Sequence, residues 1–280
     1  MILRLAALLL AVSLAQAVSA QEPGESPQRV LGLIRAQFRS HRPPPPFVSY
    51  TITRAQKTNQ GYPDVVDSYT YHIWCRTRDR AAMGRKVFRD NYEYPPEFMR
   101  PAFNEPRDPG PPTADVFEPA PVRPRPISEV PTPEPANDAT QVIGRISTII
   151  ESDYRVTALE HEGPLLHLTI EPIRDIERNR LRQIYADAAT LDVTKLVATD
   201  KLFDSGSGKG QVYGVTFTIV MGTVDGHPVV TDIHGRVGDG YAGDGVDVDF
   251  TFRDIKFPAT MPDWYFNSRL YGQHSNDIPL

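Results

Sequence analysis

The chain has 280 residues, and its 30 basic and 35 acidic side chains give a formal net charge of −5. An acidic chain without a basic block excludes a nucleic-acid partner, because neutralising phosphates requires a positive surface. Cys75 is the only cysteine, which excludes an internal disulfide. Its place in a predicted strand favours a buried apolar role over a nucleophilic one.

The first 20 residues have the pattern of a cleavable signal peptide. Arg4 precedes an apolar run from Leu5 to Leu14, and small residues then lead to Ala20. The run is too short to span a bilayer comfortably, and no later segment is apolar enough to cross one. We therefore expect an exported protein, periplasmic or extracellular, that begins at Gln21 and has no integral membrane span. An N-terminal anchor that stays uncut is the alternative.

The first element predicted after the signal is a helix. Ser26 suits the N-cap and Pro27 suits the first helical position. Val30, Ile34 and Phe38 recur at every fourth residue and give the helix one apolar face. The helix must end before the run of four prolines that follows it.

Most of the remaining chain alternates apolar and polar residues with a period of two, which predicts half-buried β-strands. The clearest case runs from Val246 to Phe252, where valines and phenylalanines alternate with polar residues. Turn signals such as Asp225-Gly226 separate the runs. About eleven strands with short connections favour an antiparallel meander over an αβ alternation. The predicted fold class is therefore mainly β, with one N-terminal α-helix.

This pattern breaks from Tyr92 to Thr140. The segment holds 14 of the 27 prolines and has little periodicity, so it cannot bury enough apolar surface to offset the entropy of ordering it. We predict an irregular proline-rich insertion, 92–140, within a single domain, 21–280. A linker between two domains is the alternative, but residues 21–91 supply too few strands for an independent core.

A glycine-rich stretch near the C-terminus bears on metal binding. Four carboxylates gather there, and their spacing does not match a helix–loop–helix calcium loop. Two of them are equally explained as the solvent-facing side of the last strand. Calcium binding is left open, and no metal and no cofactor is predicted. The four residues are Asp239, Asp244, Asp247 and Asp249.

No catalytic motif is recognisable in the chain. The stretch SGSGKG at 205–210 lacks the first glycine and the Ser or Thr of a phosphate-binding loop, which favours a hairpin turn. His161, His167, His227 and His234 have no metal-ligand spacing. We therefore expect no catalytic residues and no enzyme activity, with a hydrolase as the alternative.

Two segments resemble LolA-like outer-membrane lipoprotein carriers. VDVDFTFRDIKFPATMPDWYFN, Val246 to Asn267, resembles the closing strand and tail of that family. IYADAATLDVTKLVATD, Ile184 to Asp200, resembles a strand–turn–strand unit of the same family. The resemblance implies an open, curved antiparallel sheet, an incomplete β-barrel whose concave face is capped by helices and holds acyl chains. The proline-rich insertion and the single clear helix depart from the family pattern.

This resemblance implies that the apolar face of the sheet lines a groove for the acyl chain of a lipid or lipoprotein. Ordinary sheet core is the alternative for each residue, and a structural or interaction role with an envelope protein partner is the alternative function. The predicted lining residues are Tyr50, Ile52, Tyr71, Ile73, Phe217 and Ile219.

Overall fold

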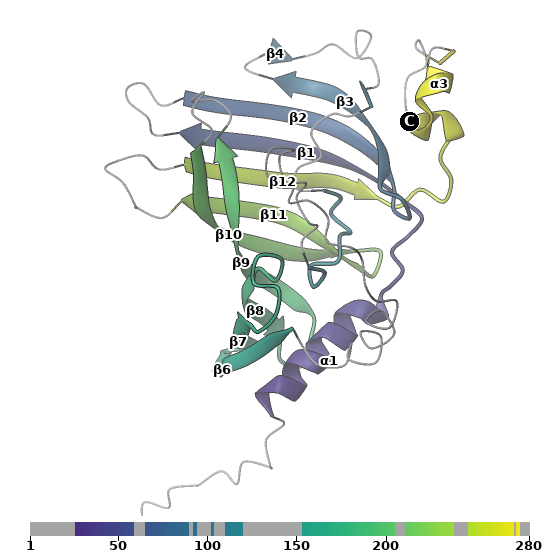
Figure 1. Cartoon of the computed structure of the whole chain (residues 1–280). Helices are drawn as coiled ribbons and strands as arrows, with labels where there is room; N and C mark the ends of the chain where they lie inside the picture. The colour runs from purple at the N-terminus through teal and green to yellow at the C-terminus, as the bar shows by residue number, and fades with distance from the viewer. Residues whose placement is uncertain are drawn as a thin grey trace, which may run out of the picture.

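Figure 1 shows the computed structural model of the chain, in which one curved antiparallel sheet dominates and helix α1 (Pro27–Ser40) lies beside its concave side. The predicted signal peptide, 1–20, lies outside the residues that the structure describes. Among the described residues, no helix is long and apolar enough to cross a membrane. The structure describes residues 26–58, 65–89, 92–93, 102–103, 110–119, 153–204, 211–237, 246–271 and 273–274.

Twelve strands form the sheet. They are β1 (Phe47–Thr58), β2 (Val65–Arg76), β3 (Ala81–Arg89), β4 (Tyr92–Glu93), β5 (Ala102–Phe103), β6 (Tyr154–Glu162), β7 (Leu165–Pro172), β8 (Leu181–Asp187), β9 (Val193–Asp204), β10 (Gln211–Val224), β11 (His227–Val237) and β12 (Val246–Lys256).

The strand order is β4-β3-β2-β1-β12-β11-β10-β9-β8-β7-β6, with β5 added beside β3. Neighbouring strands pair antiparallel throughout, and β4 and β6 lie at opposite ends of the path, so the sheet is not closed into a barrel. The predicted fold class, mainly β with about eleven strands in an open sheet and one N-terminal helix, is confirmed. The Asp225-Gly226 turn between β10 and β11 is also as predicted, with φ of 48° and 77°.

The proline-rich range connects the two edges of the sheet, because it follows β3 and precedes β6. Its described parts are β4, β5 and the turn-rich segment 110–119, which we call the strap. The two short strands pair with β3 at Arg89 and at Met83. The chain therefore passes from one open edge to the other, and the strap lies on that route (Figure 1).

Helix α1 forms where the sequence places it. The Ser26 side chain accepts a hydrogen bond from the Arg29 amide, and Pro27 occupies the first turn. The apolar face of the helix is buried in the main hydrophobic core through Val30, Leu31, Ile34 and Phe38. By the area rule this burial contributes roughly 1.5–3 kcal/mol for each large side chain.

The side chain of Gln28 attaches α1 to the edge of the sheet. Its Nε2 donates to the Tyr154 carbonyl at 2.9 Å, and its Oε1 accepts from the Val156 amide at 3.1 Å. Both backbone groups belong to β6, the last strand of the path. The amide side chain thus satisfies edge groups that would otherwise template pairing with another chain.

The convex face carries a second, smaller cluster at the C-terminal end. The 3₁₀ helix η3 (Asp263–Phe266) buries Trp264 and Tyr265 against Trp74 and Met83, and α3 (Ser268–Tyr271) follows it. Trp74 and Tyr265 meet edge-to-face with ring centroids 5.7 Å apart. The tail therefore covers β2 and β3 on the side away from α1.

His72 lies on the convex face beside this cluster. Its Nδ1 is 3.1 Å from the Thr51 hydroxyl, which in turn donates to Asp254 at 3.1 Å. With the Thr51 proton directed to Asp254, the imidazole acts as the donor from Nδ1. Burial lowers the pKa of His72 to about 4, and the nearby charge of Arg85 adds to this effect.

We predict that His72 makes the fold less stable in mild acid. Below about pH 6.5 the unfolded chain takes up a proton at this residue, whereas the folded chain resists it down to about pH 4. The free energy of unfolding should therefore fall as pH decreases through this window. Urea titrations at a series of pH values give the free energy of unfolding at each pH. Its decrease between pH 6.5 and pH 4 should be smaller for His72→Gln than for the wild type. Equal decreases would contradict the prediction.

Candidate ligand-binding cavity

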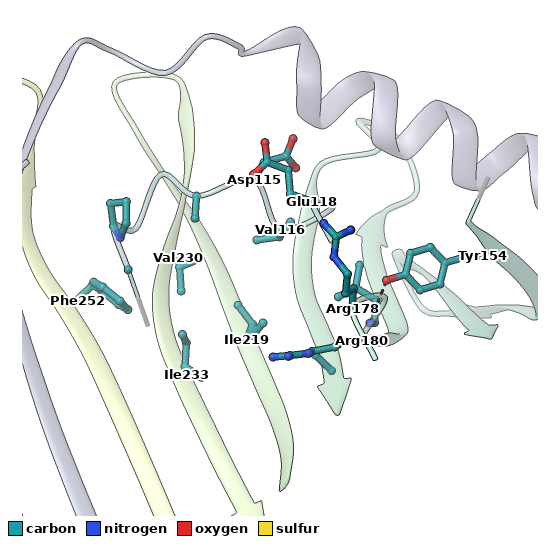
Figure 2. A pocket seen from close by; sticks show the side chains of 15 residues that line it. Asp115, Val116, Glu118, Tyr154, Arg178, Arg180, Ile219, Val230, Ile233 and Phe252 are labelled. Carbon is teal, nitrogen blue, oxygen red and sulfur yellow. Dashed lines mark hydrogen bonds between the residues drawn. The ribbon is translucent and has the colours of Figure 1, made fainter. Parts of the chain in front are cut away.

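A cavity of about 260 Å³ lies on the concave face, between the sheet and the strap. Its floor is apolar and comes from strands β8 to β12. Figure 2 shows Ile219, Val230, Ile233 and Phe252 pointing into it from three adjacent strands. Leu181 and Ala198 complete the floor on the far side.

One end of the cavity is charged and polar. Arg178 and Arg180 reach it from the β7–β8 loop, and Figure 2 places them opposite the apolar side chains. Arg180 is ion-paired with Asp200. The buried Tyr154 hydroxyl accepts a hydrogen bond from the Leu181 amide at 3.3 Å, and burial raises the pKa of Tyr154. The cavity is thus amphipathic, apolar along its floor and charged at one end.

The strap forms the side of the cavity opposite the sheet, through Gly110, Pro111, Ala114, Val116 and its two acidic residues. The Val230 amide on β11 donates to the Pro112 carbonyl at 2.8 Å. This contact lies beside a register shift between β10 and β11, next to Thr231. Such an irregularity directs a backbone group away from the ladder, and here that group holds the strap.

Helix α1 fixes the other side of the strap. Asp115 forms ion pairs with Arg39 at 3.2 Å and with Arg42 at 3.8 Å. Phe117 is buried, and its ring meets Phe38 edge-to-face with centroids 5.3 Å apart. The strap therefore lies between the sheet and the helix, with Phe117 fully buried and Val116 partly buried against the core.

The six predicted lining residues all face the concave side, because each is buried in or packed against the core to which α1 contributes. Ile219 lines the cavity. Phe217 is half-buried against the same core. The other four are almost fully buried in side-chain packing, away from the cavity lining. These four are Tyr50, Ile52, Tyr71 and Ile73.

Sequence reasoning missed the residues that frame most of the cavity. Val230, Ile233 and Phe252 belong to runs of alternating apolar and polar residues, the same pattern that indicated Ile219 as a lining residue. Arg178 and Arg180 carry no motif, and the strap is contributed by a segment whose composition gives no indication of tertiary contacts. Only the strand order brings these groups together.

The remaining candidate residues have ordinary roles where the structure describes them. Asp247 is ion-paired with Arg236, and Asp249 lies 2.9 Å from His234. Asp239 and Asp244 lie outside the described residues, as does the stretch 205–210. Cys75 is buried.

One group of described residues has ligand atoms close enough to share a metal ion, on the β6–β7 hairpin. Glu160, Glu162 and His167 lie there on the convex face, away from the cavity. His167 Nδ1 is 2.7 Å from Glu162 Oε1, and its ring stacks on Tyr185 with centroids 4.2 Å apart. His167 thus contacts Glu162 and stacks on Tyr185, and we assign no metal to this group.

Comparisons with known proteins concern the fold. No known protein family matches the chain, and no curated protein matches its sequence. Solved structures with a similar arrangement include a DUF1329 family protein from Desulfovibrio piger, with 11% identity over 88% of this chain and 100% of that chain and a TM-score of 0.38. A LolA superfamily protein from Nitrosomonas europaea has 14% identity over 84% and 96%, with a TM-score of 0.35.

A third similar structure is a putative outer membrane lipoprotein-sorting protein domain from Vibrio parahaemolyticus. It has 11% identity over 87% of this chain and 97% of that chain, and a TM-score of 0.33. The predicted resemblance to LolA-like proteins is confirmed at the level of fold. At these identities and scores the likeness carries no argument about activity or ligand.

We predict that Gly235 on β11 admits no side chain. A Cβ there would lie 2.6 Å from Phe217 Cε1 and 2.6 Å from Val248 Cγ1, so the Phe217 ring covers the glycine. Gly235→Ala should lower the free energy of unfolding by about 1–3 kcal/mol through overpacking. Gly214→Ala is the matched control on β10, since a Cβ there meets nothing within 4 Å. Equal effects of the two changes in urea unfolding would show that Phe217 leaves room at Gly235.

Proposed function

We propose that this is an exported cell-envelope protein that binds the acyl chain of a lipid or lipoprotein on its concave face, without catalysis. The observation that carries the proposal is the apolar cavity floored by five strands and roofed by a strap that is not part of the sheet. Ligand pockets are concave and mostly apolar, and a space of about 260 Å³ with an apolar floor is suited to an apolar ligand.

The chemistry of the lining supports an amphipathic ligand. Burial of each methylene against Ile219, Ile233 and Phe252 favours binding by roughly 0.8 kcal/mol. Arg178 and Arg180 line the other end of the cavity together with Asp115 and Glu118, so a polar head group would meet charged side chains there. A ligand with one apolar chain and a polar head fits both halves of the cavity.

The present cavity is too small for a long acyl chain, so the proposed ligand requires the cavity to enlarge. Pockets for drug-sized ligands measure roughly 300–1,000 Å³, and a long acyl chain needs more space than the present cavity offers. The strap is the part that can yield, because it buries one large apolar side chain whereas α1 buries four. We therefore propose that uptake displaces the strap and extends the cavity along the concave face.

The first test adds charge or bulk to the cavity. Ile219→Glu should weaken binding of a fluorescent fatty acid at least tenfold, because the apolar tail would meet an unpaired carboxylate. Thr216→Glu is the matched control, since Thr216 is exposed on the same strand. Ala198→Leu fills the cavity without charge and should also reduce binding while the fold remains stable.

Binding should show a negative heat-capacity change in calorimetry, the mark of apolar burial. A chelator should leave it unchanged, because no metal is invoked. If neither Ile219→Glu nor Ala198→Leu affects binding, the cavity is not the site. If the wild type takes up no probe, the acyl-chain proposal fails, and an interaction role without a ligand remains.

The second test releases the strap. Asp115→Asn removes the ion pairs to Arg39 and Arg42, and Phe117→Ala removes the apolar anchor. Both changes should speed probe uptake in stopped-flow fluorescence. Arg80→Gln is the control, because Arg80 and its strap partner Glu118 are both exposed, so the loss of this pair contributes little, and Arg80 does not line the cavity. Slower uptake by Phe117→Ala, together with lower affinity, would show that the strap is part of the site and does not obstruct it.

A further inference from the structure

The loop between β7 and β8, residues 173–180, exposes apolar side chains next to the charged end of the cavity. Ile173 is 51% exposed and Ile176 is 64% exposed. Within the described part of the chain, only one other large hydrophobic residue, Tyr92, is exposed. Single exposed apolar residues are ordinary, but two of them in one short loop at the end of a cavity call for an explanation.

The backbone of this loop is fixed by hydrogen bonds. The Ile173 amide donates to the Asp153 carbonyl at 2.9 Å, and the buried Asn179 side chain donates to the Arg174 carbonyl at 2.7 Å. The amides of Arg178 and Asn179 both donate to the Asp175 carbonyl. The isoleucines are thus presented by an ordered turn, and their exposure does not arise from a loose segment.

The same loop is locally basic in an acidic protein. Residues 173–180 contain three arginines and two acidic residues, a net charge of +1, whereas the whole chain has a net charge of −5. Arg174 and Arg178 flank Ile176 within the loop, and Asp175 and Glu177 are the two opposing charges. Arginine stems lie readily along apolar surface while the guanidinium stays in a polar layer. Each basic residue adds about 1 kcal/mol of attraction near an anionic lipid surface.

We infer that the β7–β8 loop docks the protein on an anionic lipid surface, with Ile173 and Ile176 inserted among the head groups and the arginines facing lipid phosphates. A protein partner fits less well, because a stable protein interface needs roughly 800 Å² from each side and eight residues do not supply it. The inference rests on the proposed function, which gives docking its purpose. Arg178 and Arg180 lie in the loop and also line the cavity, so docking places the cavity beside the bilayer.

The test is flotation of the mature protein with lipid vesicles, at low and at high salt. The protein should float with vesicles rich in phosphatidylglycerol, should float less with phosphatidylcholine alone, and should be released by salt. The double variant Ile173→Ser, Ile176→Ser should lower the apparent affinity about tenfold or more. Tyr92→Ser is the matched control, since it removes the third exposed apolar side chain and should leave binding unchanged.

Arg174→Gln should reduce binding to anionic vesicles and flatten its salt dependence. Equal binding by the wild type and the double isoleucine variant would overturn the inference, and so would capture of a soluble protein through this loop without vesicle binding. Probe uptake measured without vesicles separates the two proposals. Loss of vesicle binding with normal uptake supports docking by the loop, whereas loop-dependent vesicle binding without any uptake leaves docking in place and ends the acyl-chain proposal.

Discussion

The pairing of the first strand with the last one organises the whole molecule. β1 and β12 pair from Ser49 with Lys256 to Thr58 with Val246, in the middle of the sheet. From β1 the sheet extends in one direction through β2, β3 and β4, and from β12 it extends in the other direction through β11 back to β6. The two open edges are therefore consecutive in the sequence, and the segment between them has to travel from one edge to the other.

This constraint explains why a proline-rich segment contributes to the candidate site. A connection between the edges of a curved sheet either goes around the convex side or crosses the open side. The described strap crosses the open side, where Pro112 meets β11 and Phe117 meets α1. Prolines suit this route, because a strap away from any strand has no ladder partner for its amides. The same residues that prevent regular structure thus form the side of the cavity opposite the sheet.

Local signals in the sequence predict the elements well. The Ser26 cap, the four-residue spacing of the α1 face and the Asp225-Gly226 turn each have a short-range physical cause, and each is found in the structure. The alternation of β12 correctly places Val248, Phe250 and Phe252 in the core.

The candidate site is less predictable, because it depends on which strands become neighbours. Tyr50 and Ile52 alternate as clearly as Ile219 does, yet they pack within the core while Ile219 lines the cavity. The burial of Trp264 and Tyr265 by the C-terminal tail likewise depends on its position over β2, which no local pattern encodes.

The relative strength of the two covering elements decides which one can move. Helix α1 buries four large apolar side chains, worth together roughly 6–12 kcal/mol by the area rule, and Gln28 adds two hydrogen bonds to the β6 backbone. The strap buries Phe117, worth roughly 1.5–3 kcal/mol, and otherwise depends on a few hydrogen bonds and partly exposed ion pairs that contribute about 0–1 kcal/mol each. By this comparison α1 is held more strongly than the strap, so the strap is the cover that the proposed ligand would displace.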